Sequence, residues 1–491
     1  MGYRQKHSPA RLQRETIVKP FAHQERSVSE AVKNLRAHGF HAIFAEVGTG
    51  KSKMILDCAR SLQSSGQLDG LVIAAPKSLA GTWREQFGLH MENPGASFAS
   101  FDSTRAKTQK WMDDYRSVLA STFPVLFTNT EAYQTMPDVL VNVLKLIQTG
   151  RCLMLVIDES SDIKGPKANR ALNLTKIGQN YAFRMISTGT EITNSVLDIY
   201  QQFEFLRPGF FGFRSFFFFK NYYAILEERY LSGGRTFKAI VGFRKMEELQ
   251  KSIEPYTGQA RKKDCLDLPE KIRANMPVTL EGRCRRAYDE LKATLLTMLD
   301  TGELVTVVNK IALFTKFRQI TGGTLAGVGI IDGNNAKIRA LIGELGDHGE
   351  QAIIWSCFTE EINLLCDQLQ KAGTTAVRFD GHTSDKDRES AIGDFRSGKA
   401  RLFIANPAAA SQGLNLQTAH IQYWYSLPTQ AKHYEQGEGR THRSGQTQAC
   451  LYKKILAEGT VDYRISQILE DKTDVMSSFR DGTISDLISM I

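Results

Sequence analysis

The stretch Ala45-Glu46-Val47-Gly48-Thr49-Gly50-Lys51-Ser52 follows the apolar run His41-Ala42-Ile43-Phe44 and precedes Lys53-Met54-Ile55-Leu56. This pattern predicts a loop that leaves a buried strand and opens a helix. Gly48 and Gly50 let the backbone turn tightly enough to direct consecutive N–H groups at one anion, and the positive dipole end of the helix adds to the attraction. The stretch therefore predicts a phosphate-binding loop, and a glycine turn without a ligand is the structural alternative.

Side chains in and before this loop suit a nucleotide. Lys51 is expected to reach the β- and γ-phosphates, and the Ser52 hydroxyl is expected to ligate Mg²⁺. Gln24 precedes the loop by about twenty residues. Its amide offers both a donor and an acceptor, as recognition of an adenine edge requires. A surface glutamine is the alternative for this position.

The composition bounds the class of protein. A chain of 491 residues predicts two or three domains, and 42% hydrophobic with 23% charged residues is typical of globular proteins. The net charge of +9 favours an anionic partner such as nucleic acid, although a solvated basic surface gives the same value. The seven cysteines show no C-x-x-C spacing, which predicts reduced thiols in a cytosolic protein and no structural zinc. We expect neither a signal peptide nor a membrane helix.

Short apolar runs alternate with helical stretches after the loop. In the first half these runs are 71–75, 125–128, 152–157 and 183–187. Such runs, separated by helices, predict a parallel sheet covered on both faces and hence an α/β fold. Ligands of these sheets bind at the carboxyl ends of the strands, so the polar residues that follow each run are the candidates for a site.

An acidic pair follows one of these runs. Asp158 and Glu159 come directly after the apolar residues that end at Ile157. Asp158 is expected to hold the Mg²⁺ shell and Glu159 to orient and polarise an attacking water. A helix N-cap made by Asp158 is the alternative. The stretch Ser187-Thr188-Gly189-Thr190 ends another strand and offers hydroxyls beside the same site.

The second half predicts another parallel sheet, from the runs 353–356, 376–379, 402–405 and 421–425, but it has no phosphate loop. It contains instead the basic stretch Gln436-Gly437-Glu438-Gly439-Arg440-Thr441-His442-Arg443. Arg440 and Arg443 are three residues apart and share a face if the stretch is helical, so we expect them to donate to a phosphate bound in the first half. A basic solvated helix end is the alternative.

Two segments set the domain organisation. We interpret the aromatic-rich residues 203–220 as packing inside an inserted helical element rather than as a base-stacking surface. Arg261-Lys262-Lys263, followed by Leu268-Pro269, predicts the lobe junction. We therefore expect an N-terminal lobe at 1–262, with a helical insertion at about 200–262. A C-terminal lobe is expected at 263–491, with an insertion at about 280–345 and C-terminal helices.

Together these fragments resemble, in order, the two-lobed RecA-like motors of helicase superfamily two, and within them the Swi/Snf-type double-stranded DNA translocases. The likeness runs from Gln24 to about Lys472. Its motifs are Pro20 to Gln24, Ala45 to Ser52, Ala75 to Leu79 with Trp83, Asp158 to Ser161 with Lys164, Thr188-Gly189-Thr190 with Asn194, Arg261 to Lys263 before Leu268 to Lys271, Phe317 to Ile320, Gly413 to Leu416, and Gln436 to Gln446.

The resemblance implies two RecA-like lobes in tandem, ATP hydrolysis with Mg²⁺, and duplex DNA as the partner. It implies that Gln24 contacts adenine, that Gly48, Thr49, Gly50, Lys51 and Ser52 bind phosphates and Mg²⁺, and that Asp158, Glu159 and Gln436 serve hydrolysis. Arg440 and Arg443 would reach across the cleft, with Arg443 as the preferred arginine finger. Backbone amides and hydroxyls near Lys77, Ser78, Thr128, Ser356 and Ser411 would contact DNA phosphates.

The sequence also departs from the family pattern. Ala45 replaces the first glycine of the phosphate loop, and Ser161 stands where the family carries a histidine, so coupling between hydrolysis and the second lobe is expected to be wired differently. Thr429 lies about where a tryptophan is common. Chromatin readers and zinc fingers of larger relatives are not found, so a protein partner is expected to choose the target.

Three functions are compatible with this sequence. The leading hypothesis is an ATP-driven translocase on duplex DNA that remodels protein–DNA complexes or DNA structures. A strand-separating or annealing helicase is the second. A recruitment subunit that binds nucleic acid with weak ATPase activity is the third, and the presence of Lys51, Asp158, Glu159 and Arg443 argues against it.

Overall fold

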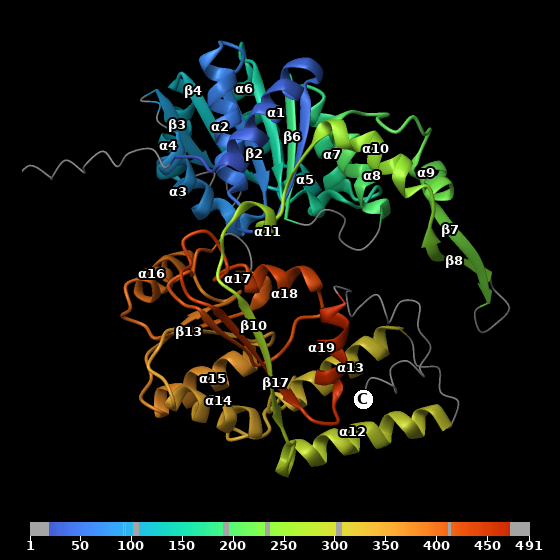
Figure 1. Ribbon diagram of the computed structural model, residues 1–491, viewed down its shortest axis with the longest axis vertical. Coiled ribbons are helices and arrows are strands. Elements are labelled where there is room, and N and C mark those ends of the chain that lie inside the picture. The colour runs from blue at the N-terminus through green and yellow to red at the C-terminus, as the bar shows by residue number, and fades with distance from the viewer. Residues whose placement is uncertain are drawn as a thin grey trace, which may run out of the picture.

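The computed structural model describes residues 19–91, 93, 95–101, 108–189, 196–230, 236–300, 307–410 and 414–471. This part of the chain forms two parallel β-sheets, one from each half of the sequence, which follow each other along the long axis (Figure 1). Helices flank both sheets. The predicted α/β fold of two parallel-sheet lobes in tandem is therefore confirmed.

The first lobe has a seven-stranded sheet in the order β3-β4-β2-β5-β6-β1-β9. All of its strand pairs are parallel. The apolar runs predicted as strands correspond to β2, β4, β5 and β6, whereas β3 and β9 lack a continuous apolar run and were missed. The strands are β1 (Phe40–Ala45), β2 (Gly70–Ala75), β3 (Ala96–Ser100), β4 (Phe123–Asn129), β5 (Leu153–Asp158), β6 (Phe183–Thr188) and β9 (Thr257–Ala260).

Both faces of this sheet are buried. Along β5, Leu153, Leu155 and Ile157 pack into one apolar cluster, while Met154 and Val156 pack into the other. This period of two is the pattern of a strand covered on both sides. The helices of the lobe are α1 (Ala22–His38), α2 (Lys51–Ser64), α3 (Ala80–His90), α4 (Gln109–Ala120), α5 (Ala132–Thr135), α6 (Asp138–Gln148), α7 (Asn169–Gly178), α8 (Ile199–Leu206), α9 (Phe216–Tyr223) and α10 (Met246–Ile253), with short 3₁₀ turns at Lys77–Leu79, Ser160–Ile163, Val196–Asp198 and Glu254–Tyr256.

The insertion at about 200–262 is not purely helical, which corrects our expectation. It contains an antiparallel hairpin of β7 (Ala224–Tyr230) and β8 (Thr236–Phe243), which projects from the lobe beyond α9 (Figure 1). The β-branched and aromatic residues of this segment satisfy strand preferences once two such runs can pair. Phe203, Phe205 and Phe219 are buried, as the packing interpretation predicts, but Phe217 and Phe218 are 66% and 50% exposed.

The second lobe has a six-stranded sheet in the order β10-β17-β16-β13-β15-β14, and all of its pairs are parallel. Its strands are β10 (Lys271–Val278), β13 (Ala352–Trp355), β14 (Ala376–Phe379), β15 (Leu402–Ala405), β16 (Ile421–Trp424) and β17 (Cys450–Ala457). A small hairpin of β11 (Thr324–Leu325) and β12 (Gly329–Ile330) lies apart from it. The helices are α12 (Gly282–Asp300), α13 (Val307–Thr321), α14 (Ala336–Gly346), α15 (Thr359–Lys371), α16 (Asp385–Arg396), α17 (Pro407–Ala410), α18 (Ala431–Glu438) and α19 (Val461–Glu470).

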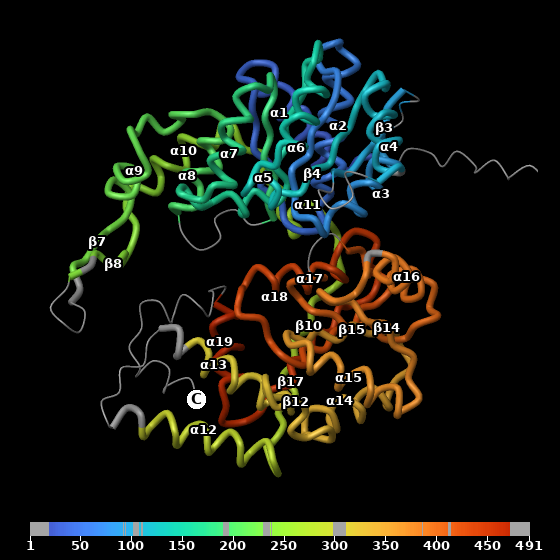
Figure 2. The backbone as a smooth tube through the Cα atoms, turned by 180° about the vertical axis from the view of Figure 1, so that it is seen from behind, coloured from blue at the N-terminus to red at the C-terminus, as the bar shows by residue number. Residues whose placement is uncertain are grey.

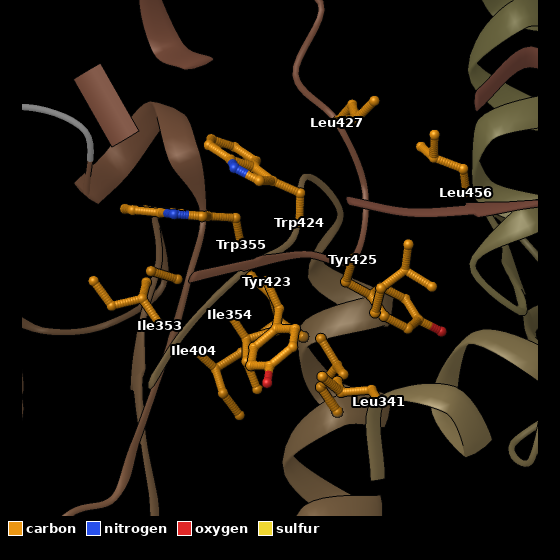
Figure 3. Packing of buried hydrophobic residues seen from close by; sticks show 14 of the residues in the cluster. Leu341, Ile353, Ile354, Trp355, Ile404, Tyr423, Trp424, Tyr425, Leu427 and Leu456 are labelled. Carbon is orange, nitrogen blue, oxygen red and sulfur yellow. The ribbon is translucent and has the colours of Figure 1, made fainter. Parts of the chain in front are cut away.

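Two buried tryptophans of this lobe set the position of α18. The rings of Trp355 and Trp424 stack with centroids 5.5 Å apart, as Figure 3 shows. A side chain at Gly437 would approach Trp424 to 2.7 Å, so glycine lets the helix sit directly on this pair. Gln422 bonds the Trp355 indole N–H through Oε1 and the carbonyl of Gly437 through Nε2. The core therefore orients the helix that faces the other lobe.

The chain passes between the lobes through the short helix α11 (Lys262–Cys265), which lies at their junction in both views (Figures 1 and 2). The first sheet ends at Ala260 and the second begins at Lys271. We propose the domain boundary at 262/263, between these strands. Among the described helices, none combines the length and the apolar character that crossing a membrane requires.

Candidate active site at the lobe junction

The predicted phosphate loop connects β1 to α2. Gly48 and Gly50 both have φ of +93°, a conformation that favours glycine. A side chain at Gly50 would lie 2.2 Å from Nε2 of Gln24, and one at Gly48 would lie 2.9 Å from Cβ of Arg443 in the second lobe. The Lys51 ammonium donates to the Ala45 carbonyl at 2.9 Å. The loop is thus enclosed by α1 and by the second lobe, and only glycine leaves room for both.

Gln24 lies against this loop. Its Nε2 donates to the Thr49 carbonyl at 2.9 Å, and its Oε1 accepts from the Phe21 N–H at 3.1 Å. His23 Nε2 also contacts the Thr49 carbonyl, at 3.0 Å. Each end of the Gln24 amide is therefore engaged by the backbone, and each keeps a second donor hydrogen or lone pair.

The acidic pair lies at the carboxyl end of β5. Asp158 accepts hydrogen bonds from Ser187 Oγ at 2.5 Å and from the Trp83 indole N–H at 3.1 Å, so the expected hydroxyl beside this site is present. Burial, together with the adjacent Glu159, raises the pKa of Asp158. Glu159 has φ of 57° and ψ of 50°, an uncommon left-handed conformation for a side-chain-bearing residue. This local strain marks the loop after β5 as a functional candidate.

At Lys51 and at Glu159, burial and the opposite charges nearby shift the pKa in opposite directions. Burial lowers the pKa of Lys51, and Glu159 and Asp158 oppose that effect. For Glu159, burial disfavours the ionised form, but Lys432, Lys51 and Arg440 outweigh it and lower the pKa. Cations from both lobes therefore hold this buried carboxylate ionised.

The second lobe reaches the acidic pair through α18. Gln436 Nε2 donates to Glu159 Oε1 at 3.3 Å, across 277 residues of sequence. The end of the helix is fixed by Glu438, which pairs with Lys271 and Arg273 of β10. Gln436, which was expected to serve hydrolysis, thus lies beside Glu159 in the structure.

Arg440 and Arg443 do not share a helical face, which corrects that prediction. The helix α18 ends at Glu438, because Gly439 begins a turn that carries both arginines. Their guanidiniums instead share one acceptor, the Leu414 carbonyl, at 3.0 Å for Arg440 and 3.2 Å for Arg443. This turn, rather than helical spacing, therefore brings the two guanidiniums close together.

The two arginines have different electrostatic neighbours. Burial and the adjacent Arg443 lower the pKa of Arg440 to about 9, and Glu159 opposes this effect. Burial and Arg396 lower the pKa of Arg443, and Glu85 opposes it. In this arrangement Arg440 is therefore coupled to the acidic pair, whereas Arg443 touches the phosphate loop at Gly48.

Sequence reasoning missed two cations at the site. Lys432 Nζ donates to Ser161 Oγ at 2.8 Å and lies 3.5 Å from Glu159 Oε2. Lys262 donates from Nζ to the His442 carbonyl at 2.6 Å and from its backbone N–H to Glu46 Oε2 at 3.0 Å. Lys432 precedes Gln436 by one helical turn, which was the available signal. Lys262 belongs to the junction segment and was read only as a boundary.

The predicted DNA contacts divide into two groups. Lys77 and Ser78 line a cavity of about 830 Å³ that also involves Phe379, Arg388 and Arg396 of the second lobe. The Thr128 hydroxyl is fully buried and bonds the Ile73 carbonyl and Tyr133, so the phosphate contact expected near Thr128 stays a prediction for the neighbouring backbone amides.

The same holds for Ser356. Its hydroxyl is fully buried and donates to Glu361 Oε2 at 2.6 Å. Five predicted motif residues lie outside the described part of the chain, namely Thr190, Asn194, Ser411, Gly413 and Lys472.

Comparisons with known proteins identify the family. The chain is 24% identical over 461 residues to the ATP-dependent helicase MG018 of Mycoplasma genitalium, covering 91% of this chain and 41% of that protein. It is 24% identical over 464 residues to the ATP-dependent helicase BRM of Arabidopsis thaliana, covering 87% of this chain and 20% of that protein. The chain thus spans less than half of the length of these relatives.

Among solved structures, the Sulfolobus solfataricus SWI2/SNF2 ATPase core in complex with dsDNA is 20% identical, with a TM-score of 0.41 and coverage of 97% of this chain and 99% of that one. The model of the helicase conserved C-terminal domain matches residues 336–445. The model of the SNF2-related domain matches residues 23–322. Because that match alone covers more than half of the 491 residues, the chain belongs to the SNF2-related family of helicase-like ATPases.

Proposed function

We propose that this chain is a DNA-stimulated ATPase that translocates on double-stranded DNA and remodels protein–DNA complexes or DNA structures. The observation that carries the proposal is the hydrogen bond between Glu159 of the first lobe and Gln436 of the second. An ATPase whose acidic pair is engaged by the other lobe links hydrolysis to the relative position of the two lobes. A motor requires that link.

The residues of the site have separate roles in this proposal. Gly48, Thr49, Gly50 and Lys51 bind the phosphates, and Gln24 contacts adenine through the amide hydrogen and lone pair that its backbone bonds leave unused. Glu159 orients and polarises the attacking water through one carboxylate oxygen, while Gln436 donates a hydrogen bond to the other, Oε1. The loop geometry fits phosphates, because two positive-φ glycines turn the backbone tightly at the start of α2, where N–H groups and the helix dipole attract an anion.

A magnesium ion fits the same site. Ser52 at the start of α2 and Asp158 at the end of β5 supply oxygen atoms of the kind that Mg²⁺ prefers. Because the described hydrogen bonds already engage both Asp158 oxygens, we propose that Asp158 holds the ion through its water shell. When bound, the ion supplies neutralisation of phosphate charge.

Arg440 and Arg443 complete the site from the second lobe. An arginine finger accelerates phosphoryl transfer by ~10³- to 10⁵-fold. At ~1.4 kcal/mol per tenfold, this corresponds to ~4 to 7 kcal/mol, available only while the lobes are closed. Arg443 remains our preferred finger, because its Cβ already abuts Gly48. To reach the γ-phosphate, its guanidinium has to leave the Leu414 carbonyl.

Duplex DNA is proposed to bind across the lobes at the cavity that Lys77 and Ser78 share with Arg388 and Arg396. Lysine, serine and arginine side chains of this kind bind DNA phosphates rather than bases. The preference for particular DNA sequences should therefore be slight, and the affinity for DNA should fall as the salt concentration rises. Closure on ATP and reopening after product release would then move one lobe along the duplex. A separate protein partner would select the target, and affinity purification from the native host is the way to identify it.

The test compares two substrates under Mg-ATP. A translocase on duplex DNA displaces the third strand of a triplex at a rate that depends on ATP, without unwinding a forked duplex. Unwinding of the fork without triplex displacement would replace this proposal with the helicase alternative. ATPase activity that is undetectable, or that duplex DNA does not stimulate, would favour the recruitment subunit.

A further inference from the structure

Lys432 places an ammonium group of the second lobe against residues 159–162 of the first lobe, the loop that follows β5. It lies on α18, and its Nζ is 2.8 Å from Ser161 Oγ, 3.4 Å from Asp162 Oδ1 and 3.5 Å from Glu159 Oε2. The Lys432 side chain is only 17% exposed. A largely buried ammonium between two carboxylates, those of Glu159 and Asp162, is a specific contact rather than a solvated surface charge.

Lys432 and Gln436 address the same carboxylate from one face of α18. They are four residues apart, so their side chains project together from the helix. Gln436 donates to Glu159 Oε1, while Lys432 lies nearer to Oε2. The hydrogen bonds of Lys432 go to Ser161 and Asp162, and Glu159 Oε2 accepts no hydrogen bond from the described residues. This oxygen therefore keeps its capacity to accept one from water.

The backbone of Glu159 requires such support. Its left-handed conformation is unfavourable for a residue with a side chain, and a strained residue persists only where its surroundings hold it. From the second lobe, Gln436 and Lys432 provide that support. Opening of the lobes withdraws both at once and leaves Glu159 and Asp162 without this cation.

We propose that Lys432 is a positioning residue that links lobe closure to the orientation of Glu159, acting through Ser161 and Asp162. This inference rests on the proposed ATPase function. It assigns a partner to Ser161, the position at which the sequence lacks the histidine of the family pattern. The coupling across the lobes is then an ammonium donated by the second lobe to a serine of the first.

The test uses Lys432→Met, which keeps much of the side-chain volume without the charge, and Lys432→Arg, which keeps the charge. With saturating duplex DNA, Lys432→Met is expected to lower kcat at least about tenfold while KM for ATP changes less than about threefold, because the phosphate loop belongs to the first lobe. Lys432→Arg should recover at least about a third of the wild-type kcat. Lys399→Met is the matched control, since Lys399 is 75% exposed and pairs within its own lobe.

A second measurement keeps the role of Lys432 separate from hydrolysis. Small-angle scattering with a non-hydrolysable ATP analogue should give a larger radius of gyration for Lys432→Met than for the wild type or Lys399→Met. Ser161→Ala should lower kcat in the wild type and have much less effect in Lys432→Met, because the two side chains act as one pair.

Several outcomes would overturn the inference. These are a near-normal kcat in Lys432→Met, a loss confined to KM, and an Arg variant no better than the Met variant. If the wild type shows no DNA-stimulated ATPase activity, the proposed function fails. Equal radii of gyration for Lys432→Met and the wild type would reject the Lys432 inference as well.

Discussion

Substitution of Gly439 by alanine is expected to slow hydrolysis by obstructing lobe closure. Gly439 directly follows α18 as its C-cap residue and faces Val47 of the predicted phosphate loop across the junction. Its φ of −67° and ψ of −4° are right-handed, so alanine introduces no backbone strain. The added methyl would lie 3.1 Å from Val47 Cγ1 and 3.2 Å from Val47 Cβ. The two closest contacts of the added methyl therefore lie across the junction, whereas the Gln436 carbonyl of its own lobe is 3.4 Å away.

The size of the effect follows from this overlap. Overpacking by one methyl group in a close-packed contact typically costs about 1 to 3 kcal/mol. At ~1.4 kcal/mol per tenfold, the closed arrangement becomes roughly 5- to 150-fold less populated. Because Gln436, Arg440 and Arg443 all reach the site from the second lobe, kcat should fall by a similar factor.

The assay is steady-state ATPase activity at saturating ATP and duplex DNA. Gly343→Ala serves as the control, because Gly343 is an exposed glycine of α14 in the same lobe with no atom within 4 Å of an added Cβ. Thermal unfolding of all variants should remain near that of the wild type, since neither substitution buries a polar group.

A compensating change tests the mechanism directly. Val47→Ala removes the γ-methyl that the methyl added by Gly439→Ala would meet, so the double variant should be at least about twofold faster than Gly439→Ala alone. A kcat for Gly439→Ala within about twofold of wild type would refute the closure argument. Equal loss in Gly343→Ala, or no recovery in the double variant, would also refute it.

Three further predictions concern charge. Arg443→Ala should retain ATP binding but lower kcat by ~10³-fold or more, whereas near-normal turnover in this variant would move the finger role to Arg440. Burial lowers the pKa of His41 to about 4, so its neutral form stabilises the fold above pH 6.5 and this stabilisation is lost as pH falls toward 4. At ~1.4 kcal/mol per pKa unit, the free energy of unfolding falls by about 3 kcal/mol over this range. Urea unfolding at several pH values should therefore show a weaker pH dependence in His41→Phe than in the wild type. Burial and Lys271 lower the pKa of Lys262 to about 7 beside the predicted phosphate loop, so binding of an anionic nucleotide at pH 7.5 should raise that pKa and take up as much as about 0.8 proton. Calorimetry in buffers of different ionisation enthalpy should find no such uptake in Lys262→Met.

Local patterns in the sequence were sufficient for the lobes and for half of the site. The phosphate loop and the Asp158–Glu159 pair each follow an apolar run, and a strand that is buried on both faces has to be apolar throughout. Gly48 and Gly50 sit at positive φ because no other residue enters that conformation without cost. These features depend on neighbours in the sequence, and a pattern can therefore report them.

Sequence patterns did not show which side chains burial would engage. The resemblance implied phosphate contacts from amides and hydroxyls near Thr128 and Ser356, and in the structure Tyr133 and Glu361 bond the hydroxyls of these two residues inside the fold. The spacing of Arg440 and Arg443 suggested a helix, but the helix ends at Glu438. Neither the depth of a strand end nor the last residue of a helix is encoded by spacing alone.

By itself, the sequence determined that this protein has two parallel-sheet lobes, a glycine-rich loop between a strand and a helix, and an acidic pair at a strand end, because each arises from a short run of residues and its immediate neighbours. Only the tertiary structure decided that Lys432 and Gln436 meet Glu159. Those contacts join residues more than 270 positions apart. They depend on how a pair of stacked tryptophans orients α18 against the other lobe, and side-chain packing of that kind leaves no periodic signal in the chain.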